Sequence, residues 1–251
     1  ISMIVVPFCS LVLSVMAAHF VLGPIGWKIG SVISSVVYAG ITGPLRIVFG
    51  AIFGFVYAPL VITGLHHMSN AIDLQLIADF GGTMLWPMIA LSNIAQGSAV
   101  LGMIYLQKND AQAQEVNIPS CISCYLGVTE PAMFGVNLKH SYPFICGMIG
   151  SACASIVCVA TKSTANAIGV GGLPGILSMQ PQSMLTFAIC MLIAVAVPFV
   201  LTVMVGKKKL QPKEVKSVEE VKSAEVTELK AFATGDVIAL KEVNDGVFSA
   251  G

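Results

Sequence analysis

The chain of 251 residues is 56% hydrophobic and only 10% charged, and its mean hydropathy is +0.86. Soluble globular domains carry about 25% charged residues, so this composition excludes an ordinary soluble domain and predicts a protein that lies in a membrane. The formal net charge is zero, and no basic patch alternates with aromatic residues, which excludes a nucleic-acid-binding protein.

Charged residues are distributed unevenly along the chain. Residues 1–206 contain ten of them and residues 207–251 contain sixteen, which predicts a membrane-embedded part followed by a part in water. The seven cysteines lie almost wholly in apolar stretches, without the second close pair or the spaced histidines of a zinc site. We therefore expect no metal and no cofactor. The chain starts at Ile1 without a basic segment before an apolar core, so we expect no signal peptide and a sequence cut at both ends.

Five stretches are apolar enough to cross a membrane as helices, which takes about 20 predominantly apolar residues. They are residues 1–22, 45–64, 84–106, 142–160 and 183–205.

The segment between the first two spans, residues 23–44, contains Lys28 and several Ser and Gly residues, with a proline near each end. This pattern predicts a short interfacial helix that links two parts of the fold.

Two further apolar stretches are broken by glycine and proline. Residues 118–138 are interrupted at 127–131, and residues 163–182 contain the run IGVGGLPG. Unwound backbone at membrane depth is tolerated only where protein or a water-filled cavity satisfies its polar groups, and such segments point to a transporter's binding site. The sequence therefore predicts an all-α polytopic membrane protein with re-entrant or broken helices.

The composition of the sequence changes toward the end of the chain. The lysines at 207–209 directly follow a span, which by the positive-inside rule predicts a cytoplasmic C-terminal tail. Residues 207–230 have the composition of a solvated linker. From residue 231, apolar residues separated by Gly and Asn-Asp-Gly breaks predict the short β start of a soluble domain.

Glu130 is the strongest candidate for a functional residue. It lies in the run GVTEPAMFGVNL, where Gly127 and Pro131 break the helix beside a carboxylate. An ionisable residue inside a membrane is costly, so it indicates a functional site, here a carboxylate that accepts hydrogen bonds from hydroxyl groups. The structural alternative is a buried ion pair with Lys139 or Arg46.

His66 and His67 form an adjacent pair at the end of an uncharged apolar span. A neutral imidazole can accept a proton near pH 7, so one ring could bind a hydroxyl group of a ligand or help to deprotonate it during catalysis. Because neighbouring residues at a helix end face different directions, the other ring could be structural. The pattern does not decide which is which.

Other polar residues near the spans are weaker candidates. Arg46, at the start of a span, could reach a cavity or extend to the membrane surface. Asn93 and Gln96 are three residues apart and share a helix face, where they could line a path or hydrogen-bond neighbouring helices. We interpret Asp73 and Asp79 as charges of a loop and a helix end.

These motifs together resemble a known family. The run around Glu130 and the double histidine are similar to the membrane-spanning IIC domain of phosphotransferase permeases in the glucose, sucrose and trehalose superfamily. The stretches GLHHMSNAIDLQLIADFGGTMLWPMIALSNIAQGSA and IGVGGLPGILSMQPQ look most like the trehalose-specific branch. The likeness spans roughly residues 1–206.

The resemblance implies a division of the chain. Residues 1–42 would be the end of an N-terminal dimerisation part with the interfacial helix, and residues 43–206 a transport domain with the sugar site, together the C-terminal portion of a IIC fold. Residues 207–230 would be a cytoplasmic linker, and residues 231–251 the start of a IIA domain.

The resemblance also implies a function, a multi-pass sugar permease of the bacterial cell membrane. A homodimer would bind an external disaccharide, with trehalose favoured, and carry it across the lipid bilayer to be phosphorylated by the IIB domain, which IIA supplies. Such a protein is part of a phosphotransferase, although the residues that carry phosphate lie outside this chain. Glu130 and one of the histidines would contact the sugar, and the same motif adds Thr129 and Asn137.

Three alternatives stay open. The sugar could be sucrose or another glucoside, because the preference for trehalose depends on the resemblance to one branch. A proton-coupled secondary transporter would share the broken helices and the carboxylate Glu130. A membrane-bound sugar sensor without transport is excluded by no residue.

Overall fold

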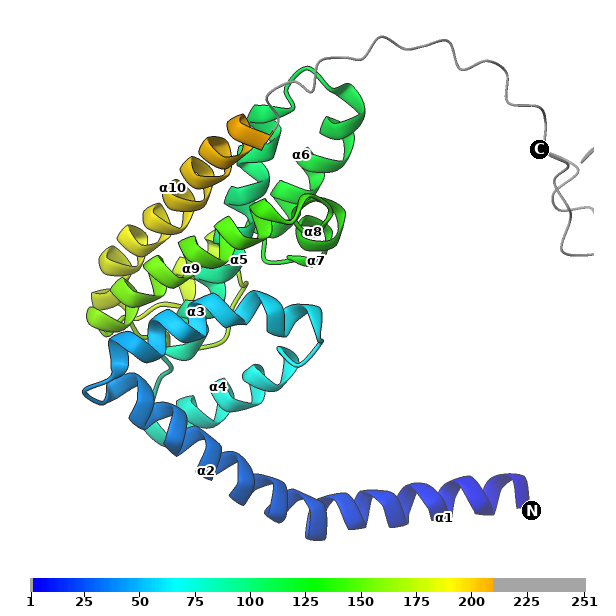
Figure 1. The fold of residues 1–251 in the computed structure, drawn as a ribbon. Helices are drawn as coiled ribbons and strands as arrows, with labels where there is room; N and C mark the ends of the chain where they lie inside the picture. Colours follow the sequence, from blue (N-terminus) through cyan, green and yellow to red (C-terminus); the bar gives the residue numbers. More distant parts are fainter. Residues whose placement is uncertain (1, 210–251) are drawn as a thin grey trace, which may run out of the picture. The chain divides into compact units, whose positions relative to one another are not determined.

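The computed structural model describes residues 2–209, and within this range the protein is helical (Figure 1). The only β-type pairings of the described part are isolated bridges that join Thr83 to Ala165 and Ala165 to Met179. The predicted helical class is therefore confirmed. The predicted β start at 231–251 and nearly all of the predicted linker lie outside the described residues.

Helix α5 (Leu85–Leu106) is the centre of the fold. Eighteen of its 22 residues are buried, as expected of a helix that is surrounded by other helices. It packs against α9 (Tyr142–Ala160), α10 (Met184–Lys209) and α6 (Ala111–Tyr125), which cover its different sides (Figure 1).

Small residues allow α3 (Arg46–Ile62) to approach α9 closely. Gly50 and Gly54, one turn apart, face Ser151, Ser155 and Val159, and a Cβ on Gly54 would lie 2.5 Å from Ser155 Oγ. In lipid the hydrophobic effect does not drive helices together. Small residues at the interface instead allow close van der Waals packing, which stabilises the association. This contact fixes α3, whose end lines the site described below.

The outward faces of several helices carry exposed apolar side chains. Phe8 in α1 (Ser2–Ala17) is 64% exposed, Val36 in α2 (Gly23–Thr42) 67% and Leu192 in α10 69%. Exposed apolar residues in this number are typical of surfaces that face lipid. Four described helices, α2, α5, α9 and α10, are long and apolar enough to cross a membrane.

Three predicted segments differ in helix length from the structure. The helix between residues 23 and 44 is not short: α2 has 20 residues and follows α1 through a π-helical turn at Ala18–Leu22. Its glycines and serines weaken the apolar pattern without ending the helix, because no proline lies in its interior. The α-helices expected as spans at 1–22 and 45–64 are shorter, with 16 residues in α1 and 17 in α3.

Both predicted helix breaks are present, and they meet each other. After α6 the chain turns at Gly127 and resumes in short helical pieces, α7 (Glu130–Ala132), the π-helical turn Met133–Asn137 and α8 (Leu138–His140). The second break contains 3-10 turns at Leu173–Ser178 and Pro181–Ser183.

Glycines bring the two breaks together. Gly127 has φ +102°, a left-handed conformation, and a Cβ on it would lie 2.9 Å from the backbone nitrogen of Gly171. The two irregular segments can pack backbone to backbone because neither position has a side chain.

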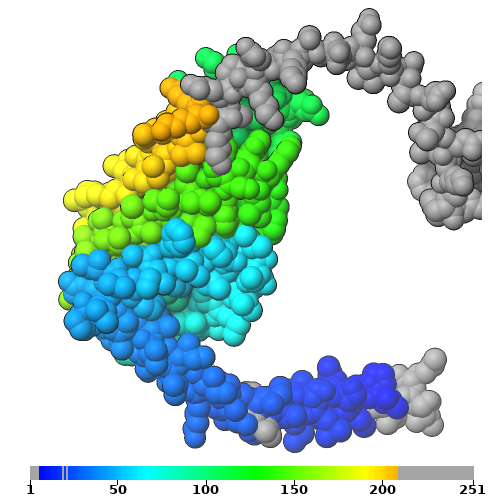
Figure 2. Space-filling model, viewed as in Figure 1, coloured from blue at the N-terminus to red at the C-terminus, as the bar shows by residue number. Residues whose placement is uncertain are grey.

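Helix α4 (His67–Phe80) follows α3 after a tight turn and contributes to the walls of the site described below. It ends at Gly81, whose φ of +73° is the left-handed conformation common after helices. Figure 2 shows the light-blue to cyan surface of α3 and α4 adjoining the green to yellow-green surface of the segment that includes α6 to α9.

Candidate functional site

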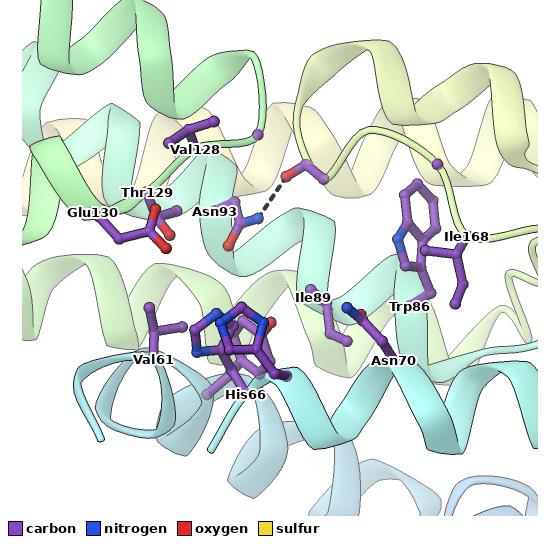
Figure 3. A pocket seen from close by; sticks show the side chains of 15 residues that line it. Val61, His66, Asn70, Trp86, Ile89, Asn93, Val128, Thr129, Glu130 and Ile168 are labelled. Carbon is purple, nitrogen blue, oxygen red and sulfur yellow. Dashed lines mark hydrogen bonds between the residues drawn. The ribbon is translucent and has the colours of Figure 1, made fainter. Parts of the chain in front are cut away.

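A cavity of about 300 Å³ lies where the break after α6 faces the turn between α3 and α4 (Figure 3). Its walls come from the end of α3 with the following turn and α4, from the first half of α5, and from residues 127–130 and 168–171. Toward one end lie most of its polar side chains together with Val61 and Val128, and toward the other lie Trp86, Ile89 and Ile168 with Asn70 (Figure 3).

The polar end brings together residues that are far apart in the sequence. Glu130, Thr129, His66, His67 and Asn93 all line it. Figure 3 shows the carboxylate of Glu130 and the amide of Asn93 directed toward the space above the imidazole rings. Glu130 starts α7 directly after the break, so the helix interruption is what aims its carboxylate into the cavity.

The structural alternative for Glu130 does not occur in this geometry. Within residues 2–209, Glu130 forms no ion pair with Lys139 or Arg46, and its side chain is exposed to the cavity. Its carboxylate is therefore free to accept hydrogen bonds from a ligand, and an ionised acceptor forms hydrogen bonds about twice as strong as a neutral one.

Asn93 is oriented by the second break. Its Nδ2 donates a hydrogen bond to the carbonyl oxygen of Gly171 at 2.8 Å (Figure 3). This bond uses the amide nitrogen and leaves the amide oxygen to accept from a ligand. The Cys124 thiol donates to the backbone carbonyl of Asn93 at 3.1 Å, which fixes the same residue from α6.

The two histidines lie side by side where α4 begins, with His66 in the preceding turn and His67 as the first residue of the helix. Their ring centroids are 4.0 Å apart, with the ring planes tilted by 37°. Burial lowers the pKa of His66 below its ordinary value of 6.5, and His67 lowers it further, against the opposing charge of Glu130. At neutral pH the His66 ring is therefore uncharged, with one nitrogen that donates and one that accepts.

The other end of the cavity contains residues that the sequence reasoning missed. Trp86 (2% exposed) and Ile89 form part of its apolar wall, and Asn70 projects toward it from α4 (Figure 3). Tyr57 of α3 also lines the cavity. The available signal for Asn70 was its position four residues after His66 and three after His67, since both spacings bring side chains close together on a helix surface. Trp86 at the start of a span is indistinguishable in sequence from an aromatic anchor at the membrane surface.

Three candidates are not brought into the cavity. Asn137 Nδ2 donates to Gln96 Oε1 at 2.7 Å, and Gln96 Nε2 donates to the Phe144 carbonyl at 3.3 Å, so both side chains hydrogen-bond between helices. Arg46 is half-buried at the start of α3, whereas Tyr57, eleven residues and roughly 16 Å further along the helix, lines the cavity.

The interpretation of Asp73 as a charge of a loop or helix end is wrong. Asp73 lies in the middle of α4 and is completely buried. Asp79 does lie at the exposed end of that helix. The spacing of three from Asn70 was the signal, since it places Asp73 on the inward face.

Comparison with known proteins identifies the family of this chain. A family model described as "Phosphotransferase system, EIIC" matches residues 1–151. The trehalose-specific EIIBC component of Escherichia coli (strain K12) is 51% identical over 207 residues, which is 82% of this chain and 44% of that protein. The sucrose-specific EIIBC component of Pasteurella multocida (strain Pm70) is 46% identical over 211 residues, with coverages of 82% and 44%.

A second trehalose-specific EIIBC component, from Bacillus subtilis (strain 168), is 45% identical over 200 residues, or 79% of this chain and 42% of that protein. The chain thus spans less than half the length of these curated relatives. No solved structure gives a significant match. Because the family model covers more than half of its residues, and a relative that is 51% identical covers 82% of the chain, this membrane protein belongs to the EIIC family of the phosphotransferase system.

Proposed function

We propose that this chain is the sugar-translocating part of a phosphotransferase permease. It binds an external disaccharide in the cavity and moves it across the cell membrane for phosphorylation by EIIB. The observation that carries this proposal is the convergence of Glu130, His66 and Asn93 opposite Trp86 in one cavity of an EIIC chain (Figure 3).

The two ends of the cavity suit the two kinds of surface that a sugar presents. Hydroxyl groups donate to the Glu130 carboxylate and the Asn93 amide oxygen, and they accept from or donate to the neutral His66 ring. The C–H groups of a sugar ring pack against the apolar wall to which Ile89, Ile168 and the edge of Trp86 contribute. A cavity of this kind selects its sugar because the wrong one leaves polar groups unpaired, which costs about 1–3 kcal/mol for each group.

The ends of the helices support an orientation in the membrane. Gly206 in α10 lies beside Leu106 and Tyr142, so the end of α5, the start of α9 and the end of α10 share one side. Lys207 and Lys208 follow at that side, and the excess of lysine in cytoplasmic segments supports its assignment to the cytoplasm.

Asn93 is 13 residues from the end of α5, which is roughly 20 Å at 1.5 Å per residue. The bound sugar is therefore far from a cytoplasmic phosphoryl donor. This distance supports transport by movement of the domain that carries the cavity, after which EIIB can reach the sugar.

The phosphoryl transfer itself requires a group that takes up a proton. A hydroxyl oxygen of the sugar forms a bond to phosphorus, the bond from phosphorus to the EIIB donor breaks, and the hydroxyl proton passes to a base. His66 or His67 can accept it, because both rings border the cavity. The phosphorylated residues belong to EIIB and EIIA, which we propose as partners of this chain. The exposed apolar faces of α1 and α2 also suit a second copy of the protein in a homodimer.

The choice of sugar is tested by equilibrium binding of labelled trehalose to the protein in proteoliposomes. We place trehalose before sucrose because two trehalose-specific relatives are 51% and 45% identical, although a sucrose-specific one reaches 46%. Unlabelled trehalose should displace the label at lower concentration than sucrose. Tighter competition by sucrose would assign the cavity to sucrose, and absence of binding of either sugar would contradict the proposal.

A further inference from the structure

Asp73 is a buried carboxylate that lies outside the cavity but contacts one of its walls. It does not line the cavity and has no exposed surface. Its Oδ1 accepts a hydrogen bond from Thr83 Oγ1 at 2.5 Å and another from the backbone N–H of Trp86 at 2.9 Å. A side chain of α4 is thereby joined to the first turn of α5, the turn that carries Trp86.

Asp73 and Thr83 together accept hydrogen bonds from backbone N–H groups at the start of α5. Thr83 Oγ1 also accepts from the N–H of Leu85 at 3.0 Å. The first amides of a helix have no partner within the helix, and their partial positive charge attracts a carboxylate. Thr83 in addition exchanges two backbone hydrogen bonds with Ala165, at 2.9 and 2.8 Å. The same contacts therefore reach the loop that contributes residues 168–171 to the cavity.

The position of Asp73 along α4 relates it to the histidines. His66, Asn70 and Asp73 follow one another at spacings of four and three, so they share one helix face. Asn70 lines the first cavity, and Leu76 lines a second cavity of about 390 Å³. Six residues separate them, roughly 9 Å of helix. Along α4, Asp73 thus lies between a residue that lines the first cavity and one that lines the second, so a displacement of α4 at this position changes the shape of the first.

The contacts of Asp73 depend on one oxygen atom. Oδ2 is buried and has no hydrogen-bond partner. Burial raises the pKa of Asp73 to about 7, against the lowering by the hydrogen bonds from Thr83 and Trp86. A neutral side chain that still accepts at Oδ1 should therefore replace the carboxylate and keep the hydrogen bonds from Thr83 and Trp86.

We propose that Asp73 is a positioning residue for sugar recognition, which holds the wall formed by His66 and Asn70 at a fixed distance from Trp86. This inference rests on the proposed function, since it assigns Asp73 a part in binding the same sugar. Groups that recognise a ligand act fully only when supporting hydrogen bonds hold them within about 0.5 Å of their place.

Four variants test the proposal. Asp73→Leu removes the acceptor, Asp73→Asn keeps it, and Thr83→Val removes one donor. Asp79→Asn is the matched control, because Asp79 lies on the same helix and accepts two hydrogen bonds from Gln75 alone. Binding of labelled trehalose gives both the dissociation constant and the number of sites. In a Trp27→Phe background Trp86 is the only tryptophan of the chain, so quenching of its fluorescence by acrylamide reports its surroundings without any sugar.

Asp73→Leu should raise the dissociation constant roughly 10- to 100-fold at an unchanged number of sites, since displacements of about 1 Å have effects of this size. It should also make Trp86 easier to quench. Thr83→Val should change the dissociation constant and the quenching of Trp86 in the same direction, but by less. The dissociation constants of Asp73→Asn and Asp79→Asn should stay within about twofold of the parent's. Fewer sites of unchanged affinity in Asp73→Leu would show a role in folding alone and overturn the proposal. If the parent binds no sugar, the proposed function fails, and unchanged quenching in Asp73→Leu would separately overturn the positioning role.

Discussion

Glu130 is the residue on which the affinity for sugar should depend most. A hydrogen bond to a charged group contributes about 1.5–3 kcal/mol and a neutral one about 1 kcal/mol. Glu130→Gln should therefore weaken trehalose binding roughly tenfold, with normal insertion into the membrane because the side chain is exposed to the cavity. Glu115→Gln in the exposed part of α6 is the matched control. Isothermal titration of the purified proteins measures the change, and equal affinities in Glu130→Gln and the parent would remove Glu130 from the site.

The affinity for sugar should depend on pH through His66. The pKa of His66 is lowered from 6.5, so its ring is neutral from pH 7 upward and gains a proton only as the pH falls below 6.5. If the neutral ring binds sugar, affinity stays constant from pH 8 to 7 and decreases at lower pH. Binding measured between pH 5.5 and 8 should lose this decrease in His66→Gln and retain it in His67→Gln. The reverse result would assign the sugar contact to His67.

The sequence patterns singled out residues that the structure brings together where chemistry and a local break coincide, and their contact with sugar stays a prediction. Glu130, Thr129, Asn93 and the histidines do line one cavity. Trp86 could not be found in this way, because an aromatic residue at the start of a span has several common uses. Which polar residue of α5 faces a cavity and which faces a neighbouring helix is set by rotation about the axis. Asn93 and Gln96, close on one face, therefore have different roles.

At the scale of elements, the contact between the two breaks should control the position of Glu130. Gly127→Ala adds a Cβ at φ +102° within 2.9 Å of the Gly171 nitrogen, a strain of about 1–3 kcal/mol that only movement of the break can relieve. Sugar affinity should fall at least fivefold. Gly81→Ala has similar strain at φ +73° but meets no atom within 4 Å, so it should lower thermal stability and leave affinity unchanged. Equal sugar affinity in the two variants would contradict this account.

The hydrogen bonds between Gln96 and Asn137 should stabilise the packing of α5 against the π-helical turn. Both side chains are buried, at 1% and 0% exposure. A double-mutant cycle with Gln96→Leu and Asn137→Leu, measured by unfolding in mixed detergent, should give a coupling energy of about 0.6–1.7 kcal/mol. Sugar affinity at an unchanged number of sites is expected to stay within twofold in Gln96→Leu. A large loss of affinity there would instead support the predicted sugar contact.

The helices were predicted well where apolar residues are continuous in the sequence. They were predicted less well where glycine and charged residues interrupt the apolar pattern. Both glycine-rich breaks occur where the sequence places them, because proline and glycine act locally on the backbone. The length of α2 could not be derived from composition. Its glycines and Lys28 suggested an interfacial segment, yet the residues from Gly23 to Thr42 form an uninterrupted helix.

At the scale of the whole molecule, the account requires that the cytoplasmic side carries the end of α10. The lysines at 207–209 support this orientation. Protease added to inside-out vesicles should cut the chain within residues 210–230, and protease added to right-side-out vesicles should not. Protection in the inside-out vesicles would invert the proposed topology, while the EIIC family membership would be unaffected.

The central claim is that a sugar bound at Glu130 crosses the membrane in a process coupled to its phosphorylation. It is tested most directly by uptake of labelled trehalose into cells that lack other sugar permeases and express the full-length protein. The account predicts uptake that stops when the phosphoryl donor is withdrawn, with label recovered as trehalose 6-phosphate, and a strong reduction in Glu130→Gln. Accumulation of unmodified trehalose that continues without the donor and collapses with the proton gradient would contradict it and favour a proton-coupled transporter.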